Sequence, residues 1–153
     1  MARKRISGKR VQPLDPKYQN SNVQNLVNHV LKLGKKQLAY RLVYKALELA
    51  ESKTNQDAIE ILDEAINQAT PSTVVKARRI RGSAQQVPRD IKPETGKALA
   101  IRWLVSAARA RTNVGMANKL ANELIDASQG QGGAVRKRQE THRMAESNRQ
   151  SAG

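Results

Sequence analysis

TVVKARRIRGSAQQVPRDI, residues 73–91, is the one stretch of this chain whose pattern favours strand over helix. Two short runs rich in β-branched residues flank Gly82, and this arrangement is typical of a tight antiparallel reversal. The pattern therefore predicts a β-hairpin over residues 73–91. In it, Val74 and Val75 are expected to pair with Val87 across a turn at Gly82.

Four cations crowd the approach to this turn. Like charges that face each other across a strand pair weaken it, so we expect the hairpin to have an anionic partner. We interpret it as an arm that reaches into RNA. The cations are Lys76, Arg78, Arg79 and Arg81.

The net charge is large and unevenly placed along the chain. It amounts to +15, from 28 Lys and Arg against 13 Asp and Glu. Residues 1–17 carry +5, residues 18–70 carry 0, residues 71–111 carry +8 and residues 112–153 carry +2. A protein that is basic only for solubility would not need this asymmetry. The distribution indicates a nucleic-acid-binding side built from the N-terminal segment, the hairpin and the helix after it.

Composition predicts one mainly α domain. With 153 residues, no Phe and 39% hydrophobic residues, the core must be built from Leu, Ile, Val and Ala, which favours closely packed helices. The absence of Cys excludes disulfides, thiolate zinc sites and cysteine nucleophiles. No apolar run approaches the ~18 residues that span a bilayer, so we expect no membrane partner.

Apolar residues recur with helical spacing on both sides of the hairpin. The first apolar stripe predicts a helix that ends before Gly34. A third helix is expected to be capped by Thr54 and Asp57. The last segment is expected to be a peripheral helix that buries too little apolar surface to stay ordered without a partner. We predict a single helical domain of about six helices (residues 18–153) with a protruding two-stranded β-hairpin and a basic N-terminal arm (residues 1–17).

Catalysis finds little support in the sequence. His29 and His142 have no Ser, Cys or metal-ligand neighbour at a useful spacing, and we interpret both as structural. The glycines at 130–133 lack the preceding strand of a dinucleotide-binding motif. We therefore predict no enzyme activity, no catalytic residue, no metal site, no cofactor and no small-molecule substrate.

The helix after the hairpin carries a polar row at Arg102, Ser106 and Arg109, which we expect to contact phosphate. Trp103 lies beside this row, and we interpret it as a core or rim anchor in preference to a base-stacking residue. Because aromatic residues are only 3% of the chain, recognition of RNA backbone and shape is expected. An architectural DNA-binding or regulatory protein with the hairpin as a basic wing is the alternative.

Five collinear blocks cover nearly the whole chain in order. They are GKKQLAY (34–40), KARRIRGSAQQVP (76–88), KALAIRWL (97–104), LANELIDA (120–127) and KRQETHRMAESN (137–148). Together these blocks resemble the bacterial-type small-subunit ribosomal protein S-seven family.

This resemblance implies a helical protein with a β-ribbon that binds the three-prime major domain of small-subunit ribosomal RNA and organises the subunit head. It implies further partners in neighbouring head proteins, the exit-site transfer RNA and the messenger RNA near its exit path. The implied ribosomal-RNA contacts are Arg3, Lys4, Arg5, Lys9, Arg10, Lys35, Lys36, Lys76, Arg78, Arg79, Lys97, Arg102, Arg109 and Arg111. The residues implied to lie near transfer RNA and messenger RNA are Arg81, Gly82, Ser83 and Arg143.

Two departures from the family pattern limit what can be carried over. Arg81 replaces the first Gly of the usual ribbon tip and Ala84 and Gln85 stand near the place of its aromatic residue, so we expect an altered turn. The aromatic and basic ending of the family is missing after Asn148. The amino-acid sequences of the blocks are similar to those of plastid or cyanobacterial members of the family. With no transit sequence ahead of the arm, this favours a plastid-encoded protein of the chloroplast stroma and leaves a bacterial cytoplasmic protein open.

Overall fold

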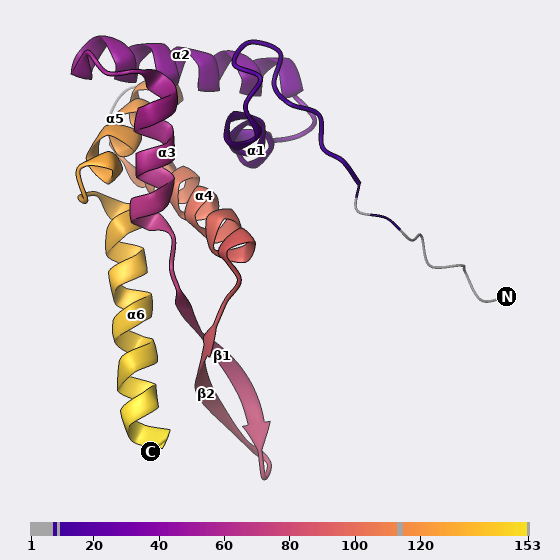
Figure 1. The fold of residues 1–153 in the computed structure, drawn as a ribbon, viewed down its shortest axis with the longest axis vertical. Helices are drawn as coiled ribbons and strands as arrows, with labels where there is room; N and C mark the ends of the chain where they lie inside the picture. Colours follow the sequence, from indigo (N-terminus) through magenta and orange to yellow (C-terminus); the bar gives the residue numbers. More distant parts are fainter. Residues whose placement is uncertain (1–7, 9, 113–114, 153) are drawn as a thin grey trace, which may run out of the picture.

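Six helices and a two-stranded antiparallel sheet make up the part of the chain that the computed structural model describes, residues 8, 10–112 and 115–152 (Figure 1). The mainly α prediction is therefore confirmed. The elements are α1 (Ser21–Val30), α2 (Lys36–Thr54), α3 (Ala58–Ala69), β1 (Thr73–Ile80), β2 (Ser83–Asp90), α4 (Pro93–Ala110), α5 (Met116–Ser128) and α6 (Gly133–Ala152).

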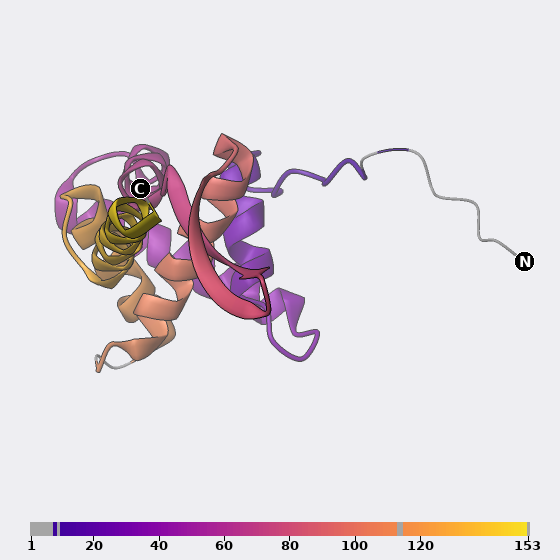
Figure 2. The same cartoon turned by 90° about the horizontal axis from the view of Figure 1, so that it is seen from below.

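The helices form a body from which the β-ribbon and α6 project in the same direction. Figure 1 shows α2 across the top of the molecule, and the ribbon and α6 at the bottom. In the view from below, α6 lies beside the ribbon (Figure 2), and it contacts both strands as well as α4. The last segment, predicted to be a peripheral helix, is thus a helix of 20 residues that flanks the ribbon.

The core is built from aliphatic side chains, as the composition predicts. Helix α5 packs against α2, α3 and α4, and Leu26, Leu62, Leu104 and Leu124 are fully buried. Burial of each such side chain contributes roughly 2 kcal/mol. Leu47 of α2 is also fully buried.

Side-chain caps determine where two of the helices begin. Asn20 accepts a hydrogen bond from the backbone N–H of Asn22 at 2.8 Å and caps α1. Asp57 caps α3, whereas Thr54 belongs to the last turn of α2, where its hydroxyl donates to the carbonyl of Ala50 at 2.8 Å. The predicted third helix therefore has one of its two expected caps.

Asp15 attaches the end of the predicted N-terminal arm to the helical body. Its carboxylate is 1% exposed and accepts hydrogen bonds from the backbone N–H groups of Tyr18 and Asn20, each at 2.7 Å. Two residues later Lys17 forms an ion pair with Glu48 of α2. The predicted arm residues Arg3, Lys4, Arg5 and Lys9 lie outside the described residues, and Arg10 is exposed.

A two-residue turn closes the ribbon. Arg81 and Gly82 have φ angles of +52° and +82°, and positive φ at both central residues is the requirement of a type I′ turn. The register places Val75 opposite Pro88 and Lys76 opposite Val87, so the valines are offset by one position from the direct pairing expected. The hairpin over residues 73–91 is otherwise confirmed.

Candidate nucleic-acid interface

Strand alternation divides the cations of the ribbon between its two faces. Because successive side chains point to opposite sides of a strand, Lys76 and Arg78 share one face and Arg79 projects from the other. Their directly opposite partners are neutral: Lys76 faces Val87, Arg78 faces Gln85 and Arg79 faces Ala84. The expectation that like charges face each other across the strands is wrong, since β2 supplies uncharged side chains at these positions.

The outer part of the ribbon is exposed on both faces. Every residue from Lys76 to Gln86 is exposed. Among the described residues at the tip, Ser83 alone has a side-chain hydrogen bond: its hydroxyl donates to the carbonyl of Ile80 at 3.1 Å. Within the described chain, no carboxylate forms an ion pair with Lys76, Arg78, Arg79 or Arg81. These charges are free for an anionic ligand.

Helix α4 places two predicted residues close to other basic elements. Arg102 lines a groove of about 570 Å³ together with Lys76 of the ribbon. Two turns further along the same face of α4, Arg109 lines a depression of about 400 Å³ with Lys35 of the loop before α2. Arg109 also donates to the carbonyls of His29 and Val30, at 3.3 and 3.4 Å, at the end of α1. Lys36 and Lys97 are exposed, in the first turns of α2 and α4.

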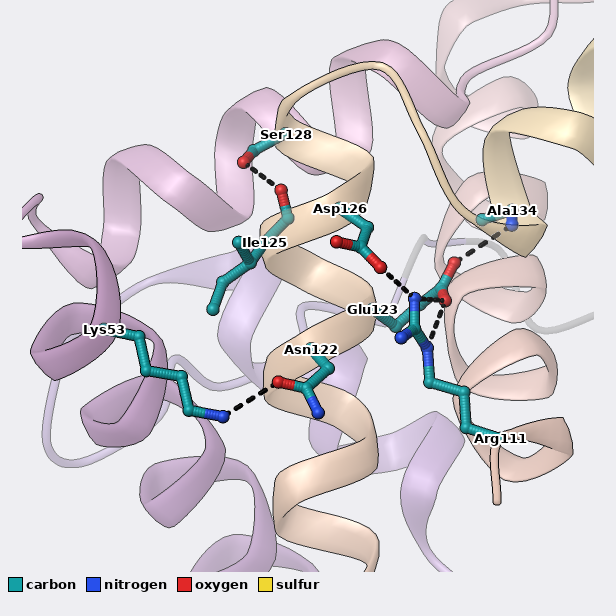
Figure 3. Close-up of polar contacts among 8 residues, drawn as sticks. All are labelled: Lys53, Arg111, Asn122, Glu123, Ile125, Asp126, Ser128 and Ala134. Atoms are coloured by element: carbon teal, nitrogen blue, oxygen red, sulfur yellow. Dashed lines mark hydrogen bonds and ion pairs between the residues drawn. The ribbon is translucent and has the colours of Figure 1, made fainter. Parts of the chain in front are cut away.

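Arg111 differs from the other predicted contacts because carboxylates already hold its guanidinium (Figure 3). Its Nε donates to Glu123 Oε2 at 2.8 Å, and its Nη2 donates to Asp126 Oδ2 at 2.5 Å. Burial alone lowers the pKa of Arg111, but the hydrogen bonds to Asp126 and Glu123 outweigh it and raise the pKa above its usual value. Glu123 is 1% exposed and also accepts from the backbone N–H of Ala134 at 3.0 Å. The cluster joins α4, α5 and α6.

The residues predicted to lie near transfer RNA are on the two projecting elements. Arg81, Gly82 and Ser83 form the exposed tip of the ribbon, and Arg143 is exposed on α6, which runs beside it (Figures 1 and 2). Both elements leave the helical body on the same side. A single large ligand on that side would reach both.

Two basic residues outside the predicted set belong to this surface. Arg89 lies on β2 opposite Val74, on the same face as Lys76 and Arg78. Lys137 of α6 lines the groove that contains Lys76 and Arg102. In the sequence, Arg89 is a cation of the predicted hairpin and Lys137 belongs to the basic run 136–138. Only the fold brings Lys137 close to the ribbon.

Both histidines have structural partners. His142 Nε2 accepts a hydrogen bond from the backbone N–H of Ser72 at 3.1 Å and so joins α6 to the root of the ribbon. Burial, together with the nearby charge of Arg138, lowers the pKa of His142. His29 Nδ1 lies 2.8 Å from the carbonyl of Asn25. No group of three or more potential metal ligands occurs within the described ranges, and none of the described helices is long and apolar enough to cross a membrane.

Acidic residues gather at the opposite end of the molecule from the ribbon. Residues 48–64 hold six carboxylates and one lysine, a net charge of −5. They span the second half of α2 and the start of α3, which lie at the top of Figure 1 while the ribbon tip lies at the bottom. An acidic cluster therefore lies at the end of the molecule away from the ribbon tip.

Comparison with known proteins identifies the family of the chain. The family described as Ribosomal protein S7p/S5e matches residues 2–149. The Small ribosomal subunit protein uS7c of Nephroselmis olivacea is 50% identical over 149 residues, which cover 97% of this chain and 96% of that relative. The predicted resemblance is thus confirmed along nearly the full length, and the chain belongs to the ribosomal protein S7p/S5e family.

Proposed function

We propose that this protein is a primary ribosomal-RNA-binding protein that organises the head of the small ribosomal subunit. The coarser part follows from its family: it is a structural ribosomal protein and no enzyme activity is indicated. The relative uS7c is by name a small-subunit protein, and we place this chain in the small subunit of a plastid ribosome. The observation that carries the finer proposal is the ribbon, whose exposed cations have no carboxylate partner among the described residues.

The ribbon would act by neutralising phosphates from two sides. Arginine can grip phosphate in a bidentate manner, and a two-stranded ribbon is narrow enough to enter a groove or junction of folded RNA. Because Arg78 and Arg79 project from opposite faces, RNA that used both would lie on both sides of the ribbon. Such binding reads shape and backbone more than base sequence.

We propose further RNA contacts beyond the ribbon, and the exposure and existing partners of each cation rank their expected contributions. We assign ribosomal RNA to the exposed cations of the ribbon, of the loop before α2 and of α4, and to the N-terminal segment. Arg111 would contribute least, since Glu123 and Asp126 hold its guanidinium. The ribbon tip and Arg143 would lie near the exit-site transfer RNA and the messenger RNA, with head proteins as further neighbours.

Equilibrium binding of the purified chain to head-domain RNA tests the proposal. Affinity should exceed that for an unrelated structured RNA of equal length, and log affinity should fall with log salt with a slope of roughly −0.7 to −0.9 per phosphate neutralised. Equal affinity for the two RNAs would refute it. Duplex DNA is the matched competitor: ready displacement of the RNA by DNA would favour an architectural DNA-binding protein instead.

A further inference from the structure

Side chains of the ribbon base, α4 and α6 line a groove. These elements meet on the side where the ribbon and α6 leave the body (Figures 1 and 2). The volume of the groove is about 570 Å³, within the range of about 300 to 1,000 Å³ that is usual for ligand pockets. We call it the stem groove. The lining residues that matter here are Lys76, Leu99, Arg102, Trp103, Lys137 and Met144.

The floor of the stem groove is apolar but not part of the core. Leu99 and Trp103 of α4 are half-buried, and Met144 of α6 is 48% exposed. An exposed apolar surface of this kind, between two elements that contact each other, lacks a covering group within the described chain. Trp103 offers the largest flat surface there, and none of the described cations lies over its ring.

The rim of the stem groove is positively charged. Lys76 comes from β1, Arg102 from α4 and Lys137 from α6, so three elements each supply one cation. No carboxylate is found among the described residues that line the groove. An apolar floor inside a cationic rim is complementary to a group that is flat and apolar in its body and anionic at its edge.

We propose that the stem groove binds a single unstacked nucleotide of RNA, with its base against Trp103 and its flanking phosphates at Lys76, Arg102 and Lys137. This rests on the proposed RNA-binding function and specifies how one part of that interface works. An unstacked base regains the apolar contact it has lost when it packs on an aromatic ring. Trp103 would thus contact a base, beyond the anchor role that its sequence context indicates.

The emission of Trp103 measures occupancy directly, because the chain contains one Trp. Full-length protein is titrated to saturation at low salt with head-domain RNA and, separately, with a perfectly paired RNA duplex. We expect loss of emission and of acrylamide quenching with the first RNA and little change with the second, which has no unstacked base. At low salt non-selective complexes also form. The emission therefore reports on the groove even if selective binding, and with it the proposed function, fails.

Ala98→Leu fills the groove without touching the core, since Ala98 lines it and is exposed. We expect head-domain RNA to bind about tenfold more weakly, in the range for loss of one stacked base, with an unchanged salt slope. Ser52→Leu is the control, because Ser52 is exposed near the end of α2, in the acidic stretch away from the ribbon, and it should bind as the parent does. Circular dichroism checks that both variants fold.

Two results would overturn the proposal. One is unchanged Trp103 emission at saturation with head-domain RNA. The other is equal RNA affinity of the Ala98→Leu and parent proteins, which would assign the groove to an apolar side chain of a neighbouring protein. Lys137→Ala gives an independent reading of the rim, since loss of one phosphate contact lowers the salt slope by roughly 0.7 to 0.9.

Discussion

Arg79 and Arg111 carry the same guanidinium in opposite settings. Arg79 is exposed on a strand opposite Ala84 and has no carboxylate partner among the described residues, whereas two carboxylates bind Arg111, one of them 1% exposed. A charge left free on the surface is available to a ligand, and a charge that compensates a buried carboxylate belongs to the fold. Residue type and net charge do not distinguish these roles; the neighbours do.

The largest effect is expected at the internal cluster. Arg111→Ala leaves the carboxylate of Glu123 buried without its cation, and removal of one partner of such a pair costs about 3 kcal/mol of the free energy of unfolding. Urea denaturation measures this. RNA affinity of the folded variant should change little. Arg109→Ala, whose side chain bonds two backbone carbonyls, is the contrast: a small loss of stability with a measurable loss of RNA affinity.

The ribbon should show the reverse pattern. Arg78→Ala with Arg79→Ala should weaken binding of head-domain RNA and lower the salt slope by roughly 1.4 to 1.8, since two phosphate contacts are lost. The free energy of unfolding should stay within about 0.5 kcal/mol, as for exposed substitutions. Filter binding at several salt concentrations and circular dichroism provide the two readings. A large loss of helical signal would mean that these arginines stabilise the fold.

The turn offers a smaller test. Arg81 adopts a φ of +52°, which costs a side chain with a Cβ about 1 kcal/mol, so Arg81→Gly should stabilise the ribbon by a few tenths of a kcal/mol after the entropy of glycine is counted. Slower hydrogen exchange of ribbon amides would report it. Arg81→Asn tolerates the same backbone and separates loss of charge from relief of strain. Faster exchange in Arg81→Gly would contradict the prediction.

A pH-dependent effect is expected at the root of the ribbon. The pKa of His142 is lowered in the fold, so the unfolded chain binds the proton more readily and the contribution of His142 is present above pH 6.5 and lost as pH falls from there through the folded pKa. Protonation removes the acceptor for the Ser72 N–H, worth roughly 0.5 to 1 kcal/mol. The Ser72 amide resonance should shift with this titration, and His142→Leu should abolish the shift.

Much of the fold follows from local patterns. Helical spacing of apolar residues before Gly34 and after Pro93, and the reversal at Gly82, predict the helices and the hairpin because these signals depend on neighbours within a few positions. The sequence predicts the register of the ribbon only to within about one residue, since a shift of one residue leaves the same valines near each other. Strand alternation alone implies that Arg78 and Arg79 point apart.

The rest depends on contacts between distant segments. The family resemblance implied that Arg111 contacts RNA, but the packing of α5 against α4 brings Glu123 and Asp126 to its guanidinium. Lys137 reaches Lys76 and Arg102 only because α6 lies beside the ribbon. No spacing rule along the chain encodes these pairings. The basic interface could therefore be located from the sequence, but the sequence does not distinguish the exposed cations from those that pair with carboxylates.

The separation of acidic residues 48–64 from the basic ribbon has a kinetic consequence. Residues 48–64 at one end carry −5 and the ribbon, residues 73–90, carries +4, which gives the protein a dipole component along its long axis. In the field of a polyanion such a dipole turns before contact, so encounters begin with the ribbon end forward. At low salt the acidic end thus shapes the approach to RNA without touching it, whereas at physiological salt, where the Debye length is about 8 Å, this orienting effect is largely screened.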